Sequence, residues 1–166
     1  SRAIGEDVGT YTFTPSAAAD SNYTVSFVTA DFTITQAGLT VTADSGQTKV
    51  YGATDATLTY TITGFVNSDA ESDLDTGVSI SRASGEDVGT YTITPSAAAD
   101  SNYTVSFVTA DFTITQADLT VTADSGQTKV YGATDATLTY TITGFVNSDT
   151  ESDLDTGVSI ARAIGE

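Results

Sequence analysis

The feature that most constrains this chain is a near-literal internal repeat with a period of 80 residues. Residues 1–38 match residues 81–118 except at three positions, and residues 39–86 match residues 119–166 except at three others. An internal period has to be recognised before individual elements are assigned, because it changes the interpretation of the whole fold. The sequence therefore predicts a tandem array of similar small units.

The joints between units contain almost no linker. Residues 31–44 and 111–124 read DFTITQAGLTVTAD and DFTITQADLTVTAD. Apolar residues alternate with threonine on both sides of the Gln-Ala pair, which indicates two half-buried strands placed end to end. Because no Gly/Ser-rich or Pro-rich segment separates these strands, we expect a stiff joint and a rod of units.

Division at the joints gives three segments. Residues 1–38 are predicted to be the C-terminal half of a repeat, 39–118 a complete repeat, and 119–166 the N-terminal half of a repeat. An alternative division has boundaries near Ser81 and Ala161 and makes two self-contained units. A unit of this size is large enough for a small independent core.

Composition limits the classes of partner. The formal net charge is −17, and the sequence has no Cys and no His. Residues 39–118 contain eleven acidic residues against Lys49 and Arg82. Such a surface repels nucleic acid and anionic membranes and attracts divalent cations. No apolar run approaches the roughly 20 residues of a membrane-spanning helix, so we expect no membrane insertion.

One unit contains about seven short predicted strands with turn signals between them, which is typical of an all-β sandwich. We expect Pro95 to end its strand and the last two strands to form a hairpin. A β-grasp arrangement, with residues 67–74 as its one short helix, is the alternative. The predicted strands are 39–43, 48–51, 57–63, 78–80, 90–94, 103–107 and 112–114. The expected core is Leu39, Val41, Val50, Leu58, Tyr60, Ile62, Val78, Ile80, Tyr91, Ile93, Tyr103, Val105, Phe107, Phe112 and Ile114.

A short motif supports the immunoglobulin-like version of the sandwich. Asp87 to Tyr91 reads DVGTY, which resembles the D-x-G-x-Y corner of immunoglobulin-like domains. In that corner the tyrosine hydroxyl reaches back to the backbone near the turn. Here a further pair of strands follows the motif, whereas that corner normally has one strand left.

The densest group of oxygen ligands is an acidic loop. Alternate carboxylates in a turn can surround Ca²⁺, which takes six to eight oxygen ligands. The same residues in a solvated loop need no metal, and both interpretations stay open. The candidate calcium ligands are Asp69, Glu71, Asp73 and Asp75. Asp44 and Asp124, near the joints, are a second candidate calcium clamp, and no cofactor is required.

Lys49 is the only lysine of its repeat. A lysine on an edge strand discourages pairing between sheets, and this is the interpretation we favour. The alternative is a buried lysine that forms an intramolecular isopeptide with Asn67, assisted by an acid. Asn22 and Asn102 lie in N-x-T sequons and are interpreted as loop residues.

The ordered set of motifs resembles the MBG-type repeat of the YGX class, and its relative the YDG repeat, of bacterial surface proteins. This resemblance covers the whole period and implies an extracellular, adhesin-like protein without catalytic residues. The matching elements are Leu39-Thr-Val-Thr-Ala43, Lys49-Val-Tyr-Gly52, Leu58-Thr-Tyr60, Gly64-Phe-Val-Asn67, Gly85 to Tyr91, and Ser101-Asn-Tyr-Thr104 running to Phe112-Thr-Ile-Thr115. The family pattern has Asn-Gly-Asp where this chain has Asn67-Ser68-Asp69.

These observations lead to one functional expectation and one alternative. The chain is expected to be a structural stalk repeat on the bacterial cell surface that projects a terminal adhesive module. The alternative is a repeat that binds a glycan or host protein weakly and gains avidity by repetition. Paired carboxylates without His or an aromatic platform do not indicate an enzyme. Expected partners are neighbouring repeats or chains joined head to tail, and host or matrix ligands held by other domains.

Overall fold

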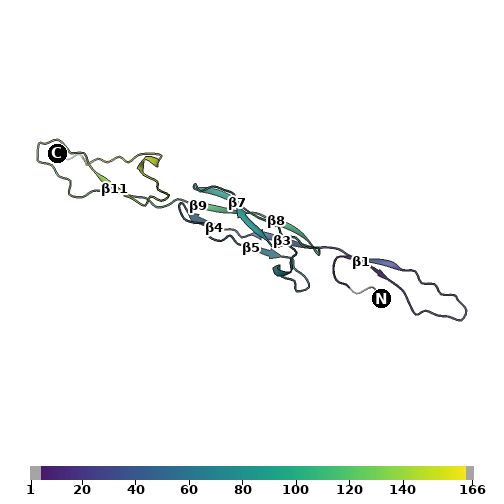
Figure 1. Cartoon of the computed structure of the whole chain (residues 1–166). Coiled ribbons are helices and arrows are strands. Elements are labelled where there is room, and N and C mark those ends of the chain that lie inside the picture. The colour runs from purple at the N-terminus through teal and green to yellow at the C-terminus, as the bar shows by residue number, and fades with distance from the viewer. Residues whose placement is uncertain (1–4, 164–166) are drawn as a thin grey trace. The chain divides into compact units, whose positions relative to one another are not determined.

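The computed structural model describes residues 5–163, which form an all-β chain (Figure 1). Its only helices in that range are the three-residue 3₁₀ turns η1 (Glu71–Asp73) and η2 (Glu151–Asp153). None of the described residues form a helix long and apolar enough to cross a membrane. The strands are β1 (Gly9–Phe13), β2 (Ala30–Ile34), β3 (Ala37–Ala43), β4 (Gln47–Val50), β5 (Tyr60–Thr63), β6 (Ser79–Arg82), β7 (Gly89–Ser96), β8 (Tyr103–Val108), β9 (Ala110–Thr115), β10 (Thr120–Ala123) and β11 (Tyr140–Thr143).

The middle repeat forms two sheets. One has the order β5-β3-β8 and the other the order β4-β9-β7-β6. β3 runs antiparallel to β5 and parallel to β8, with Leu39 opposite Val105 and Val41 opposite Phe107. Fully buried side chains come from both sheets, among them Leu39 and Val41 of β3 and Phe112 and Ile114 of β9. The predicted all-β fold is confirmed.

The end segments form smaller sheets. β1 pairs antiparallel with β2, and β10 pairs antiparallel with β11. By their contacts the residues group into two units. The first unit is Ser1–Gln47, Thr57–Ala83 and Thr92–Phe112, and the second is Thr48–Ala56, Ser84–Tyr91 and Thr113–Glu166.

The joints are as short as predicted. Two residues separate β2 from β3, and four separate β9 from β10. The tyrosine corner is also present, because the hydroxyl of Tyr91 donates to the carbonyl oxygen of Asp87 at 2.8 Å. Its counterpart Tyr11 makes the same bond to Asp7 at 2.8 Å.

The prediction of which face of β4 is buried is wrong. Val50 is 47% exposed, while Lys49 is buried. Successive side chains of a strand point to opposite faces, so an error of one position exchanges the buried and exposed sets. Phe107, also expected in the core, is 41% exposed. Of the expected core residues, Leu39, Val41, Ile93, Tyr103, Phe112 and Ile114 are buried, and Leu58, Tyr60, Ile62, Val78, Ile80, Tyr91 and Val105 are half-buried.

Three predicted strand features also differ. The strand predicted at 57–63 begins only at Tyr60. Pro95 lies inside β7 and is fully buried rather than ending the strand. β8 and β9 are not a hairpin, since they belong to different sheets although only Thr109 separates them. A single residue can carry the chain from one sheet to the other, whereas a hairpin needs both strands in one sheet.

The alternative β-grasp fold requires a short helix at 67–74, and the structure has only the three-residue turn η1 there. The loop before it contains Asn67 and Ser68 at φ of 56° and 70°. Residues in this left-handed region cannot continue a right-handed helix. The short helix of a β-grasp fold therefore does not form in the middle repeat.

Candidate functional site

The four predicted calcium ligands each accept a hydrogen bond from a different donor. Asp69 accepts from the hydroxyl of Tyr103 at 2.7 Å, and Glu71 accepts from the hydroxyl of Tyr60. The remaining two accept from backbone N–H groups: Asp73 from Ala70 at 2.8 Å, and Asp75 from Ser101 at 2.9 Å. These bonds give the acidic loop a structural role in holding its own conformation and that of the loop before β8.

Within residues 5–163, no group of three or more carboxylates is arranged to hold a metal ion. The second pair of candidate ligands is engaged with threonine. Asp44 accepts from the hydroxyl of Thr61 at 2.8 Å, and Asp124 accepts from that of Thr141 at 2.9 Å. Hydrogen bonds from Thr139 and Thr141 hold the pKa of Asp124 below its ordinary value. Calcium binding at either place remains a prediction.

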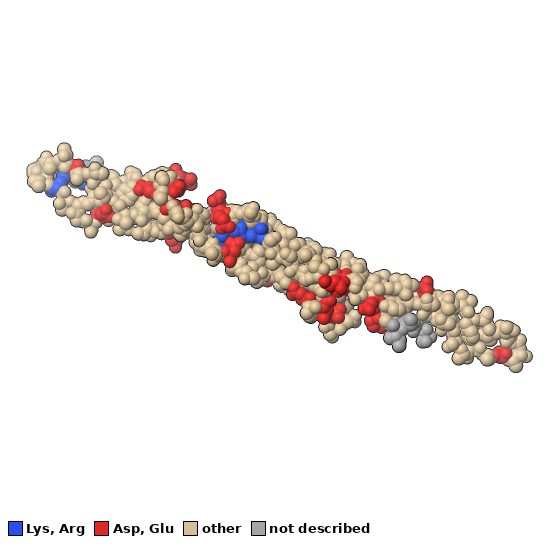
Figure 2. Space-filling model, viewed as in Figure 1, with Lys and Arg blue, Asp and Glu red and all other residues tan. Residues whose placement is uncertain are grey.

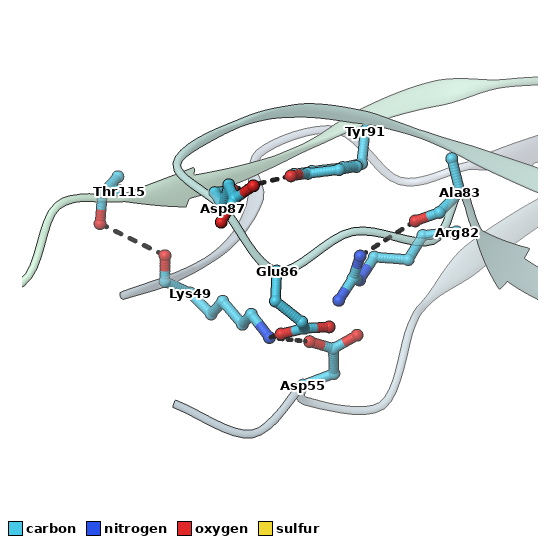
Figure 3. Close-up of polar contacts among 8 residues, drawn as sticks. All are labelled: Lys49, Asp55, Arg82, Ala83, Glu86, Asp87, Tyr91 and Thr115. Atoms are coloured by element: carbon cyan, nitrogen blue, oxygen red, sulfur yellow. Dashed lines mark hydrogen bonds and ion pairs between the residues drawn. The ribbon is translucent and has the colours of Figure 1, made fainter. Parts of the chain in front are cut away.

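Lys49 of β4 is the centre of a charged cluster (Figure 3). Its ammonium group contacts Oδ1 of Asp55 at 2.8 Å and also Oε2 of Glu86. The Lys49 side chain is 5% exposed. The hydrogen bonds with Asp55 and then Glu86 raise the pKa of Lys49 above its ordinary value of 10.5. Figure 2 shows few basic atoms on the drawn face, and a basic patch in the middle repeat lies among acidic atoms.

The arrangement around Lys49 is an ion-pair cluster and not the isopeptide set that was the alternative interpretation. The partners are Asp55 and Glu86, and Asn67 is not among them. A protonated amine has no lone pair with which to attack the side-chain amide carbon of Asn67, and the raised pKa of Lys49 keeps its amine protonated at neutral pH. Lys49 does lie on an edge strand of its sheet, as predicted. Its side chain is buried, so it does not project from that edge to discourage pairing with another sheet.

The counterpart of this cluster in the C-terminal segment differs. Lys129 contacts Asp135 at 2.6 Å, and Arg162 contacts the same carboxylate at 2.6 Å. The hydrogen bond from Arg162 lowers the pKa of Asp135 most, the bond from Lys129 adds to this effect, and the resulting pKa is about 2. The Lys129 side chain is 37% exposed. Glu166, the counterpart of Glu86, lies outside the described residues.

The first joint is held by an asparagine. The side-chain oxygen of Asn102 accepts from the backbone N–H of Val8 at 2.8 Å, and its amide nitrogen donates to Asp7 at 3.4 Å. Asn102 therefore connects the loop before β8 to the turn that precedes β1. Gln36 adds a bond to the carbonyl of Ser101 at 3.1 Å. Asn102 is a loop residue, as predicted from its sequon, and its side chain makes hydrogen bonds to Val8 and Asp7 across this joint.

Tyr103, next to Asn102 in the sequence, is buried. It bonds to the loop that contains Val66 and Asp69. Its hydroxyl accepts from the backbone N–H of Val66 at 3.0 Å and donates to Asp69. The bond with the Val66 backbone lowers the pKa of Tyr103, but burial and the bond to Asp69 outweigh it, so the net direction is upward. The ring of Phe65 packs edge-on against Tyr103, with centroids 5.8 Å apart.

The second joint is held by Tyr51 and Gly52. The hydroxyl of Tyr51 donates to Oδ2 of Asp149 at 2.9 Å. Gly52 has a φ of 82°, and a Cβ atom there would lie 2.5 Å from a methyl carbon of Val146. Glycine at this position therefore permits both the left-handed backbone and the close approach of Val146.

The sequence did not predict that Tyr51, Gly52 and Asn102 make contacts at the joints. All three lie in the motifs that carry the family resemblance, so the motifs already marked these positions as part of the repeat pattern. The motifs do not indicate which residue each one contacts, because the contacting residue lies in another copy of the repeat. Only the folded joint identifies Asp149, Val146 and Val8 as the contacts.

Comparison with known proteins agrees with the sequence motifs. The family model of the MBG domain, YGX type, matches residues 1–33, 39–113 and 119–166. No curated protein and no solved structure gives a significant match. The matched family is associated with repeats of surface proteins. Because the matched segments cover most of the chain, this protein belongs to the family of YGX-type MBG domains.

Proposed function

We propose that this chain is part of the extracellular stalk of a bacterial cell-surface adhesin, and that it holds a terminal binding module away from the cell. Its role is mechanical and structural rather than catalytic. The observation that carries the proposal is the direct joint: the strand of one repeat runs into the next after two to four residues. Membership of a family associated with surface-protein repeats supports the same setting.

Side-chain contacts across the joints support a spacer role. A flexible linker lets neighbouring domains rotate freely, whereas short connections with specific contacts restrict them. Here Tyr51 bonds to Asp149 and Asn102 bonds to Val8. Each pair joins residues of different repeats, so each bond limits the angle between successive repeats.

The acidic composition suits a long extracellular spacer. A net charge of −17 over 166 residues favours the solubility of a long array of repeats. Cysteine is absent from the sequence, so near-identical repeats cannot cross-link wrongly through disulfides. A separate risk for near-identical neighbouring repeats is that they exchange segments during folding.

Small-angle scattering of chains with increasing numbers of repeats tests this proposal. A stalk requires the maximum dimension to grow by a constant increment for each added repeat. A matched series with a Gly/Ser linker inserted after Gln116, within the joint, should grow more slowly, because flexible chains extend with the square root of length. Equal growth in both series, or a compact particle, contradicts the proposal. Specific glycan or protein binding by a single repeat would favour a binding module instead.

A further inference from the structure

The middle repeat receives any tension in the chain through its first and last strands. The chain enters it at β3, two residues after β2, and leaves it at the end of β9, four residues before β10. β9 follows β8 after the single residue Thr109. Because these connections are short, a pull on the two joints acts on β3 toward its N-terminus, and on β8 and β9 toward their C-termini.

β3 and β8 are neighbours in one sheet and run parallel. Their register contains six residue pairs, from Ala37 opposite Tyr103 to Thr42 opposite Val108. Opposite pulls on two parallel neighbours make them slide along each other, so the evenly spaced bonds of a parallel ladder carry the load together. If the same two strands were pulled apart from one end, their bonds would break one after another.

Side chains add bonds between the same two segments. The side-chain amide nitrogen of Gln36 donates to the carbonyl oxygen of Ser101 at 3.1 Å, and its oxygen accepts from the hydroxyl of Thr104 at 3.0 Å. Further along, the hydroxyls of Thr40 and Ser106 lie 3.1 Å apart within hydrogen-bond distance. All of these bonds connect the start of the repeat to the β8 segment, so sliding has to break them too.

The second sheet also joins the entry of the chain to its exit. β4 follows β3 after three residues and lies next to β9. The backbone N–H of Tyr51 donates to the carbonyl oxygen of Thr115 at 2.8 Å. The hydroxyl of Thr115 donates to the carbonyl oxygen of Lys49 at 3.3 Å (Figure 3). The first two strands of the middle repeat therefore contact its last two strands in both sheets.

We propose that β3 and β8 form a shear clamp, a pair of strands that must slide past each other before tension can extend the middle repeat. β5, the other neighbour of β3, is antiparallel to it and belongs to the interior of the repeat sequence. Tension therefore reaches β5 only after the clamp has failed. The inference rests on strand direction and register and not on the proposed stalk, so either can fail without the other.

The first test changes the direction of pulling and leaves the fold the same. The chain has no native cysteine, so two introduced cysteines define where the handles of a single-molecule force experiment attach. Thr35→Cys with Gln116→Cys pulls along the chain, from outside β3 and β9. Gly38→Cys with Thr104→Cys pulls two residues that lie opposite each other, and separates the strands from one end. The unfolding force should be several-fold higher for the first pair, and equal forces overturn the proposal.

The second test removes side-chain bonds on and off the clamp during pulling from Thr35→Cys and Gln116→Cys. Thr104→Ala with Ser106→Ala deletes the hydroxyl bonds described above, and should lower the unfolding force. Thr94→Ala with Ser96→Ala is the matched control.

The control removes the same two residue types at the same spacing from β7, on the side that pairs with β6. It should leave the unfolding force unchanged. Urea unfolding of both double variants measures their equilibrium stability separately, because forced unfolding follows the barrier to unfolding. An equal loss of force in both double variants, or no loss in either, contradicts a load path through β3 and β8.

Discussion

The hydroxyl of Tyr51 donates a hydrogen bond to Oδ2 of Asp149, 2.9 Å away and 98 positions later in the sequence. This pair connects the YG motif of one repeat to the acidic loop of the next. In the middle repeat, the equivalent carboxylate, Asp69, accepts a bond from Tyr103 of its own repeat. The acidic loop thus supplies carboxylates to tyrosines within a repeat and across a joint.

Removing the Tyr51 hydroxyl should weaken the second joint. Tyr51→Phe keeps the ring and deletes the bond to Asp149, which should lower the free energy of unfolding of this region by about 1 kcal/mol. Tyr131→Phe is the control, because Tyr131 is the sequence counterpart of Tyr51 and its side chain is fully exposed. Urea unfolding followed by tyrosine fluorescence checks the difference. A loss as large for Tyr131→Phe as for Tyr51→Phe would show that the joint bond contributes nothing.

Glycine 52 should be required for the approach of Val146. Gly52→Ala and Gly132→Ala introduce similar backbone strain, since the φ values are 82° and 80°, at a cost of roughly 1–2 kcal/mol. Of these two glycines, Gly52 has a neighbour that a Cβ atom would displace, and Gly132 has none within 4 Å. Methyl NMR spectra should therefore show a shift of the Val146 resonances in Gly52→Ala and none in Gly132→Ala. Unchanged Val146 resonances in both variants would rule out this contact.

The Asn67-Ser68 turn should be improved by glycine. Ser68 has a φ of 70°, a region that glycine occupies without steric cost. Ser68→Gly should raise the free energy of unfolding by about 1 kcal/mol, since relief of the backbone strain exceeds the added freedom of the unfolded chain. Ser81→Gly in β6 should instead lower it, because glycine weakens a strand interior. Thermal unfolding of both variants measures the two signs.

The Lys49 cluster should make stability fall at alkaline pH. The folded-state pKa of Lys49 is raised above 10.5, so its contribution is fully present below pH 10.5 and is lost as the pH rises through the folded value. Lys49→Met should lower stability at neutral pH and make the alkaline decline shallower. Some decline should remain, because the pKa values of Tyr60 and Tyr103 are also raised. The control is Lys129→Met, whose lysine is more exposed and whose alkaline profile should stay close to that of the unmodified chain.

Calcium should stabilise the chain no more than sodium chloride of equal ionic strength. The carboxylates of Asp69, Glu71, Asp73 and Asp75 already accept separate hydrogen bonds, and gathering them around one ion would break these bonds. Both salts reduce the repulsion within an acidic chain by screening. Melting temperatures in matched CaCl₂ and NaCl series provide the measurement. A rise specific to Ca²⁺ that is lost in Asp73→Asn would establish the site.

The sequence by itself determined the repeat, the strand-to-strand joints, the all-β class, the tyrosine corner and the acidic loop. These features depend on local alternation and turn chemistry, which the residues carry with them. It did not determine which face of β4 is buried, because Lys49 and Val50 are adjacent and only the assembled sheet selects between them. It also did not show that β8 pairs with β3 instead of β9, since local pattern carries no information about strand partners.

The two copies of one strand show this limit most directly. Residues 39–43 and 119–123 are both LTVTA, yet Val41 is fully buried and Val121 is 45% exposed. Local sequence made both segments strands, and it gave both the same apolar face. The rest of the middle repeat, which supplies β8 beside β3 and also a second sheet, decided that the apolar face of residues 39–43 is removed from water. Burial, and the stability that follows from it, belongs to pairs of distant segments rather than to either segment alone.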